Sequence, residues 1–160
     1  MTDIKTFAIR VYSKPGITDA CLTLQDEQAI DVPLLLFCGW YGVYAGAIPD
    51  DVFVRARALS QTLGEHVIYP LRQIRRWMKN KHSDADWIKL REAIKRQELE
   101  AELWLLTRLQ AQCGTAVTAS TTPSMAMVLA NLLNCVTDHK NVPAAALGRL
   151  EQVATACCQP

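Results

Sequence analysis

The sequence contains none of the short motifs that mark a common catalytic or metal-binding site. It has no CxxC pair, no HExxH, no GxSxG and no glycine-rich phosphate loop. Its six cysteines and three histidines do not fall at the spacings of zinc ligands. We therefore expect no metal and no cofactor, and the absences favour a protein that is not an enzyme.

The chain also lacks a charge excess and an export signal. Its formal net charge of +1 excludes a surface that is globally specialised for nucleic acid or anionic membrane, so such a role would need a local patch. The start MTDIKTF has no apolar run of the kind found in signal peptides. We expect a cytoplasmic protein whose six thiols stay reduced and mostly behave as small buried hydrophobic groups.

Residues 32–49 carry no charged side chain, so a membrane-spanning helix has to be considered for this stretch. The apolar part is about fifteen residues, or roughly 22 Å as a helix, which is shorter than the roughly 30 Å of a membrane core. Asp31 stands before it as an N-cap candidate, and Pro33 is tolerated in a first turn. The stretch predicts a buried central helix over about 34–45, with Phe37 and Trp40 in the core.

Helical periodicity runs through the rest of the chain and predicts an all-α fold, a compact bundle of about six or seven helices. The segment that follows Pro49 should break or kink near Gly64 and Pro70. The expected helices span about 3–13, 17–28, 34–45, 49–80, 84–112, 123–136 and the residues from 143 onward.

The distribution of charge divides the chain. Of 33 charged residues, 29 lie in residues 1–108, and the remainder of the chain is apolar and alanine-rich. We expect a helical core over 1–112, a loop or linker over 113–124, and two short helices over 125–160 packed on the same domain. Within the helix over 84–112 we expect an inner stripe of Trp87, Leu90, Ile94, Ala101 and Trp104.

The segment FAIRVYSKPGITDACLTLQDEQAIDVPLLLFCGWYG, residues 7–42, resembles a family of small proteobacterial proteins described as a domain of unknown function. The shared pattern is FAxxxYxxPGxxxxCLxLQDxxxxDVxLLLFCxWxG. The chain departs from it in having Lys5-Thr6 where the family tends to carry Trp, and Pro33 where it tends to carry Asn. The resemblance implies a helical fold and brings no catalytic residue, cofactor or substrate.

The clearest surface signal is a group of four basic residues, here called the basic stripe: Arg72, Arg75, Arg76 and Lys79. Their spacing places them on one side of a helix, opposite Leu71, Ile74 and Met78. Such a stripe favours an acidic protein partner, with nucleic acid as a weaker possibility because aromatic residues are not interleaved for base stacking. The alternative is a solvated face that Glu98, Glu100 and Glu102 partly neutralise.

A second hypothesis places a pocket near the central helix. Its candidate residues are Gln25, Asp26, Asp31, Cys38 and Trp40. The alternative is that Asp31 caps a helix and that Gln25 and Asp26 satisfy backbone groups at a helix end. Cys38 as a nucleophile would need a nearby base, and a thiol in an apolar helix is more often inert.

Together these patterns favour a non-enzymatic interaction or regulatory module. It would bind another protein through the basic residues of 72–96 or through the apolar C-terminal third. The alternative is an enzyme or a binder of small apolar ligands with a cleft near Phe37–Tyr44. No pattern in the sequence identifies the partner or an oligomeric state.

Overall fold

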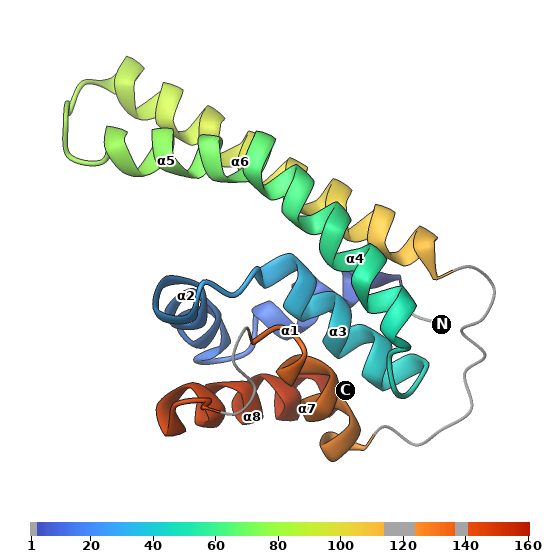
Figure 1. Cartoon of the computed structure of the whole chain (residues 1–160). Coiled ribbons are helices and arrows are strands. Elements are labelled where there is room, and N and C mark those ends of the chain that lie inside the picture. The colour runs from blue at the N-terminus through green and yellow to red at the C-terminus, as the bar shows by residue number, and fades with distance from the viewer. Residues whose placement is uncertain (1–2, 114–123, 137–140) are drawn as a thin grey trace.

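The fold is helical throughout residues 3–113, 124–136 and 141–160, the parts of the chain that the computed structural model describes. These ranges contain no strand, which confirms the all-α prediction. The described residues form eight α-helices, since a π-helical turn, η1, divides the expected segment 49–80 in two (Figure 1). In chain order the elements are α1 (Ile4–Tyr12), α2 (Ile17–Gln28), α3 (Val32–Tyr44), α4 (Asp50–Leu63), η1 (Gly64–Ile68), α5 (Tyr69–Met78), α6 (Ala85–Gln112), α7 (Met125–Leu133) and α8 (Ala144–Cys158).

Helix α3 lies at the centre of the bundle. The Asp31 carboxylate accepts a hydrogen bond from the Leu34 amide at 3.1 Å, which caps the helix as predicted. Every residue from 32 to 43 is buried, because α1, α4, α6, α7 and α8 all pack against this helix. Phe37 and Trp40 are completely buried, so the prediction that they belong to the core is confirmed.

The C-terminal helices pack on the N-terminal ones. Helix α7 lies against α3, and α8 lies against α2 and α7. Two glycines of α3 allow this close approach: a Cβ atom at Gly42 would lie 3.0 Å from the Val128 Cα atom, and one at Gly39 would lie 2.8 Å from the Cys157 Sγ atom. Much of the apolar surface of α7 and α8 is thus covered within the chain, although Met125 and Met127 of α7 stay exposed. The linker expected over 113–124 lies almost entirely outside the described residues.

A helical hairpin projects from the bundle (Figure 1). Helices α4 and α5 continue one another through η1, and α6 returns antiparallel to α5. The break expected near Gly64 is the π turn, where the Tyr69 ring lies so close to Gly64 that a Cβ atom there would be 3.0 Å from it. We call residues 69–102 the arm, and the remaining helical residues the body.

The inner stripe expected in α6 is wrong at two positions. Leu90 and Trp104 are about half exposed, whereas the buried residues of this helix are Glu98, Leu105, Leu106 and Leu109. The physical reason is a change of neighbour along the helix. The first half of α6 packs mainly on α5, and the second half packs on the body, so no single stripe faces inward over its whole length.

Candidate functional site

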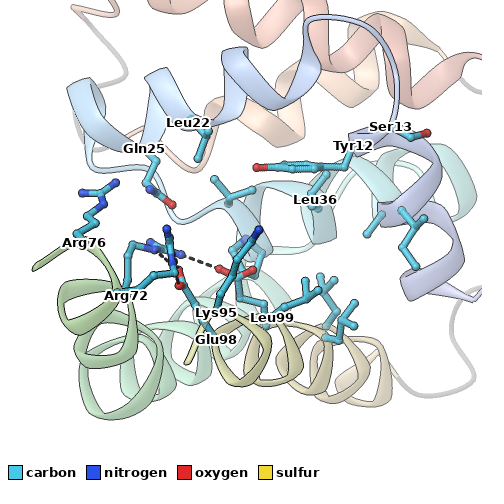
Figure 2. Close-up of a pocket in the computed structure, with 18 residues that line it drawn as sticks. Tyr12, Ser13, Leu22, Gln25, Leu36, Arg72, Arg76, Lys95, Glu98 and Leu99 are labelled. Atoms are coloured by element: carbon cyan, nitrogen blue, oxygen red, sulfur yellow. Dashed lines mark hydrogen bonds and ion pairs between the residues drawn. The ribbon is translucent and has the colours of Figure 1, made fainter. Parts of the chain in front are cut away.

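A cleft of about 520 Å³ lies between the arm and the body. Figure 2 shows the two sides facing each other: helices α1, α2 and α3 supply one wall, and helices α5 and α6 supply the other. The cleft has the size of a small-ligand site or of a groove for a peptide segment. Its lining side chains include Tyr12, Leu22, Gln25 and Leu36 from the body and Arg72, Arg76, Lys95, Glu98 and Leu99 from the arm.

Apolar side chains line much of the cleft while remaining in contact with water. Ile9 of α1, Leu22 of α2 and Leu99 of α6 are all exposed although they are large and apolar. They come from three helices and share one concave surface. Covering them would release apolar area from water, so the cleft favours an apolar occupant.

A network of ion pairs forms the arm side of the cleft. Arg72 Nε donates to Glu98 Oε1 at 2.8 Å, and Arg72 Nη2 donates to Glu102 Oε1 at 2.6 Å. Arg75 Nε donates to Glu98 Oε2 at 2.5 Å. Glu98 is 5 % exposed. These bonds join α5 to α6 and hold the guanidinium groups in place. They also explain why the charge of Glu98 can be buried, since a buried charge is tolerated only when it is paired.

The pKa shifts of the acids follow from this packing. Burial would raise the pKa of Glu98, but hydrogen bonds from Arg75 and Arg72 outweigh it and hold that pKa below its usual value. For Glu102, burial outweighs the attraction of Arg72, and the pKa is raised. Burial, together with the neighbouring Cys21 and Glu102, raises the pKa of Tyr12 to about 12. The Tyr12 hydroxyl is therefore protonated at neutral pH and able to donate.

The mouth of the cleft carries two cations that are held weakly. Arg76 Nη2 contacts Asp26 Oδ1 at 2.9 Å, and Lys95 Nζ lies 3.7 Å from Glu92 Oε2. All four of these side chains are at least half exposed. Pairs of this kind contribute little to stability because water screens them. A carboxylate of a bound molecule can therefore replace their present partners at small cost.

The structure divides the basic stripe. Arg72 and Arg75 turn into the cleft wall, Arg76 lies at the mouth, and Lys79 is exposed beyond the cleft. The expectation that all four side chains are free to bind a partner is wrong for Arg72 and Arg75. These two pair with Glu98 and Glu102 of the antiparallel α6, which lie opposite them. The prediction that Ile74 lies on the side of the helix facing the core is also wrong, since Ile74 is exposed.

The five residues of the predicted pocket do not meet in one cavity. Gln25 lines the cleft, and Gln25 and Asp26 line a smaller hollow of about 280 Å³ beside Tyr69. Asp31 caps α3 and accepts a hydrogen bond from the Tyr69 hydroxyl at 3.4 Å. Cys38 and Trp40 are completely buried and line none of these hollows, because neighbouring helices cover α3. The cleft therefore lies away from Phe37–Tyr44.

Cys38 has the surroundings of an inert thiol. Its Sγ atom lies 3.6 Å from that of Cys135. That hydrogen bond, followed by burial, raises the pKa of Cys38 well above its usual value. A thiol that resists ionisation is a poor nucleophile. Among the described residues, no group of His, Cys, Asp and Glu side chains is arranged to hold a metal ion.

Sequence reasoning missed the apolar half of the cleft, but its alternative interpretation of the basic stripe did name Glu98 and Glu102 as acids that partly neutralise it. The acids had a signal: Arg72 and Arg75 are three residues apart, Glu98 and Glu102 are four apart, and a short connection makes the two helices antiparallel. Complementary spacing on such a hairpin predicts pairing. The sequence carries no comparable signal for the grouping of Ile9, Leu22 and Leu99, because they belong to three separate helices.

Comparisons with known proteins agree with the resemblance found in the sequence. No curated protein and no solved structure matches the chain. No helix within the described ranges is long and apolar enough to cross a membrane. A family model described as "Protein of unknown function (DUF2390)" matches residues 3–109, a range that contains α1 to α5 and all but the end of α6. Since this match covers more than half of the sequence, the chain belongs to the DUF2390 family.

Proposed function

We propose that the protein is a non-enzymatic interaction module that binds a segment of a partner protein in the cleft between arm and body. The observation that carries the proposal is the exposure of Ile9, Leu22 and Leu99 on one concave surface beside a fixed group of cations. Partner helices bind in grooves of this kind through apolar anchors one turn apart. The proposal includes a cytoplasmic location, which the six unpaired thiols support.

The charges of the cleft indicate what the partner segment carries. Four basic side chains and two acidic ones line it: Arg72, Arg75, Arg76 and Lys95 against Glu98 and Glu102. Because the two acids already pair with Arg72 and Arg75, the cations available to a partner are Arg76 and Lys95. We therefore propose an apolar segment with an acidic residue at one end.

Two of the titratable groups in the cleft, Glu98 and Tyr12, are poorly suited to act as a general base. A general base must be free to accept a proton at the working pH, but Glu98 is held as a carboxylate by two arginines. Tyr12 has a pKa of about 12, so it does not supply a base at neutral pH. Glu98 is suited to accepting hydrogen bonds from the arginines of the wall, and the Tyr12 hydroxyl is suited to donating one to a bound molecule.

A second candidate is a small amphipathic anion in the same cleft. The volume of about 520 Å³ falls within the range of small-ligand sites. Glu102, whose pKa burial raises, could then take up a proton when the ligand excludes water. This candidate keeps the binding role and replaces the protein segment by a small molecule.

The test compares two leucines of α6. Leu99 lines the cleft and is 54 % exposed, whereas Leu90 does not line it and is 51 % exposed. Leu99→Glu should abolish binding of the partner recovered from cells with the wild-type chain, because it places a charge among the apolar side chains. Leu90→Glu should leave binding unchanged. Both variants should fold normally, since surface substitutions shift stability by about 0.5 kcal/mol or less.

Binding is measured between purified partner and purified variant by calorimetry. A loss of affinity of at least tenfold for Leu99→Glu alone supports the proposal. Equal affinities for both variants would contradict it. If purified wild-type protein instead releases a small molecule on denaturation that Leu99→Glu protein lacks, the second candidate replaces the first.

A further inference from the structure

The far end of the arm carries a second exposed surface, separate from the cleft. We call it the tip surface and define it by Trp77, Lys79, Lys81, Ile88 and Lys89, which are all exposed. It includes the last turn of α5, the connection to α6 and the first turn of α6. Figure 1 shows this end of the hairpin extending beyond the other helices, so it can reach a flat surface that the body does not touch.

The tip surface is built on an ordered connection. Trp87 Nε1 donates a hydrogen bond to the Met78 carbonyl at 3.1 Å. The Trp87 ring meets the His82 ring at 4.7 Å and the Trp77 ring at 6.2 Å between centroids. Asn80 takes the left-handed conformation, with φ of 61°, which Asn tolerates better than most residues. Trp87 thus holds the connection, and Trp77 remains exposed beside it.

Exposed lysines gather at this end of the arm. Residues 77–92 contain four basic side chains and three acidic ones, Lys79, Lys81, Lys89 and Arg91 against Asp84, Asp86 and Glu92, and Arg91 contacts Glu92 at 3.5 Å. Asp84 is occupied in capping α6, where it accepts from the Trp87 amide at 2.9 Å. No ion pair recorded within the described ranges involves Lys79, Lys81 or Lys89. These lysines are available to an external anion.

We propose that the tip surface docks the protein on an anionic phospholipid surface. The three lysines contact lipid phosphates, and Trp77 and Ile88 enter the interfacial region between headgroups and acyl chains. Tryptophan favours that region because its ring is apolar and its N–H is polar. Each lysine near such a surface is attracted by its negative potential, and burial of the two apolar side chains adds to this attraction.

The mixture of side chains favours a lipid surface over nucleic acid. A phosphate backbone would attract the lysines equally well, but it offers nothing to the exposed isoleucine. The isoleucine instead lines a hollow of about 520 Å³ at the tip, together with Lys79, Lys81 and Arg91. A membrane interface binds both kinds of side chain: anionic headgroups attract the cations, and the acyl boundary buries the apolar groups. Exposed cations and exposed apolar groups together at the end of the arm are therefore best explained by lipid.

The experiment uses the full chain and two kinds of vesicle, phosphatidylcholine alone and phosphatidylcholine mixed with phosphatidylglycerol. Co-sedimentation should show binding to the mixed vesicles only, and binding should weaken with salt because charges are screened within about 10 Å at 0.1 M. Lys79→Glu with Lys81→Glu should lower the affinity by at least about tenfold. The matched control, Lys5→Glu with Arg57→Glu, reverses two exposed cations of the body and should retain binding.

A tryptophan pair tests the apolar contribution. Trp77 is 61 % exposed at the tip, and Trp104 is 48 % exposed near the base of the arm. Trp77→Ala should weaken vesicle binding and abolish the blue shift of tryptophan fluorescence, whereas Trp104→Ala should do neither. Leu99→Glu should bind vesicles normally, which separates this inference from the proposed function of the cleft.

Three results would overturn the inference. They are no binding to the mixed vesicles, equal binding to both kinds of vesicle, or an equal loss in the body control and the tip variant. Binding of the wild-type chain to single-stranded or duplex oligonucleotides but not to vesicles would also overturn it and assign the tip to nucleic acid. Melting curves of all variants confirm that each loss is measured on folded protein.

Discussion

The body and the arm of this protein are stabilised by different interactions. In the body, α3 is buried on all sides among apolar residues. In the arm, α5 has one buried residue, Met78, and is joined to α6 largely by the ion pairs of Arg72 and Arg75 with Glu98 and Glu102. Hydrophobic burial is insensitive to pH and salt over ordinary ranges, whereas ion pairs respond to both.

This difference explains why the cleft lies where it does. In the body, Phe37 and Trp40 are completely buried and neither lines the cleft. An arm with few apolar residues facing the body does not pack tightly against it, and Leu22 and Leu99 remain exposed on the two sides of the gap. The tip surface also stays exposed to solvent, because no helix of the body within the described ranges packs against it (Figure 1).

The largest expected effect separates the two regions by stability. Trp40→Ala should destabilise the protein by about 3–5 kcal/mol, because it removes a completely buried ring and leaves a cavity. Trp77→Ala should cost about 1 kcal/mol or less, since its ring is mostly exposed. Urea denaturation measures both. Equal losses would show that the arm has an apolar core comparable to that of the body.

The next effect concerns the ion pairs of the arm. Glu98→Gln should cost about 1.5–3 kcal/mol at neutral pH, because it weakens charge-assisted hydrogen bonds to Arg72 and Arg75. The pKa of Glu98 is lowered from 4.5 in the folded protein, so its carboxylate stabilises the fold above that value. This stability is lost as pH falls through the folded pKa.

Glu102 provides a control of opposite sign. Its pKa is raised from 4.5 in the folded protein, so the wild-type protein loses stability as pH rises from that value through the folded pKa. Relative to wild type, Glu102→Gln should therefore gain stability as pH rises, while Glu98→Gln should lose it. Denaturation curves across acidic and neutral pH test both signs. Parallel curves for the two variants would contradict the assigned environments.

A third prediction concerns the contact between α3 and α7. Gly42→Ala should destabilise the protein by about 1–3 kcal/mol, because the new Cβ atom would lie 3.0 Å from the Val128 Cα atom. Gly148→Ala in α8 is the control, since nothing lies within 4 Å of its Cβ position, and it should gain about 0.5–1 kcal/mol. Thermal melting measures both. A neutral Gly42→Ala would mean that the two helices do not pack closely.

The smallest effect concerns the exposed half of the basic stripe. Arg76→Glu with Lys79→Glu should shift stability by less than about 1 kcal/mol, because both side chains are exposed. Arg72→Glu with Arg75→Glu should cost more, because it sets new acids against Glu98 and Glu102. If the two double variants lost similar amounts of stability, the division of the basic stripe would be contradicted, and all four side chains would be equally solvated.

The sequence predicted those elements whose signal is local. The Asp31 cap, the apolar helix after it and the break at Gly64 depend on residues that are neighbours in the chain. The burial of Glu98 was not predicted, because it depends on the arginines of another helix. Leu90 and Trp104 followed the helical period but are about half exposed, because the two halves of α6 pack on different neighbours. Periodicity gives the relative faces of a helix, and only packing decides which face is covered.

The central claim is that the cleft holds a segment of a partner protein. The most direct measurement places a photoreactive amino acid at position 99 or, as the control, at position 90, and maps the partner peptide that each one captures in cells. The account predicts one crosslinked partner segment at position 99, apolar with an acidic residue near its end, and no crosslink to that segment at position 90. Capture of the same segment at both positions, or of none at position 99, would contradict the account.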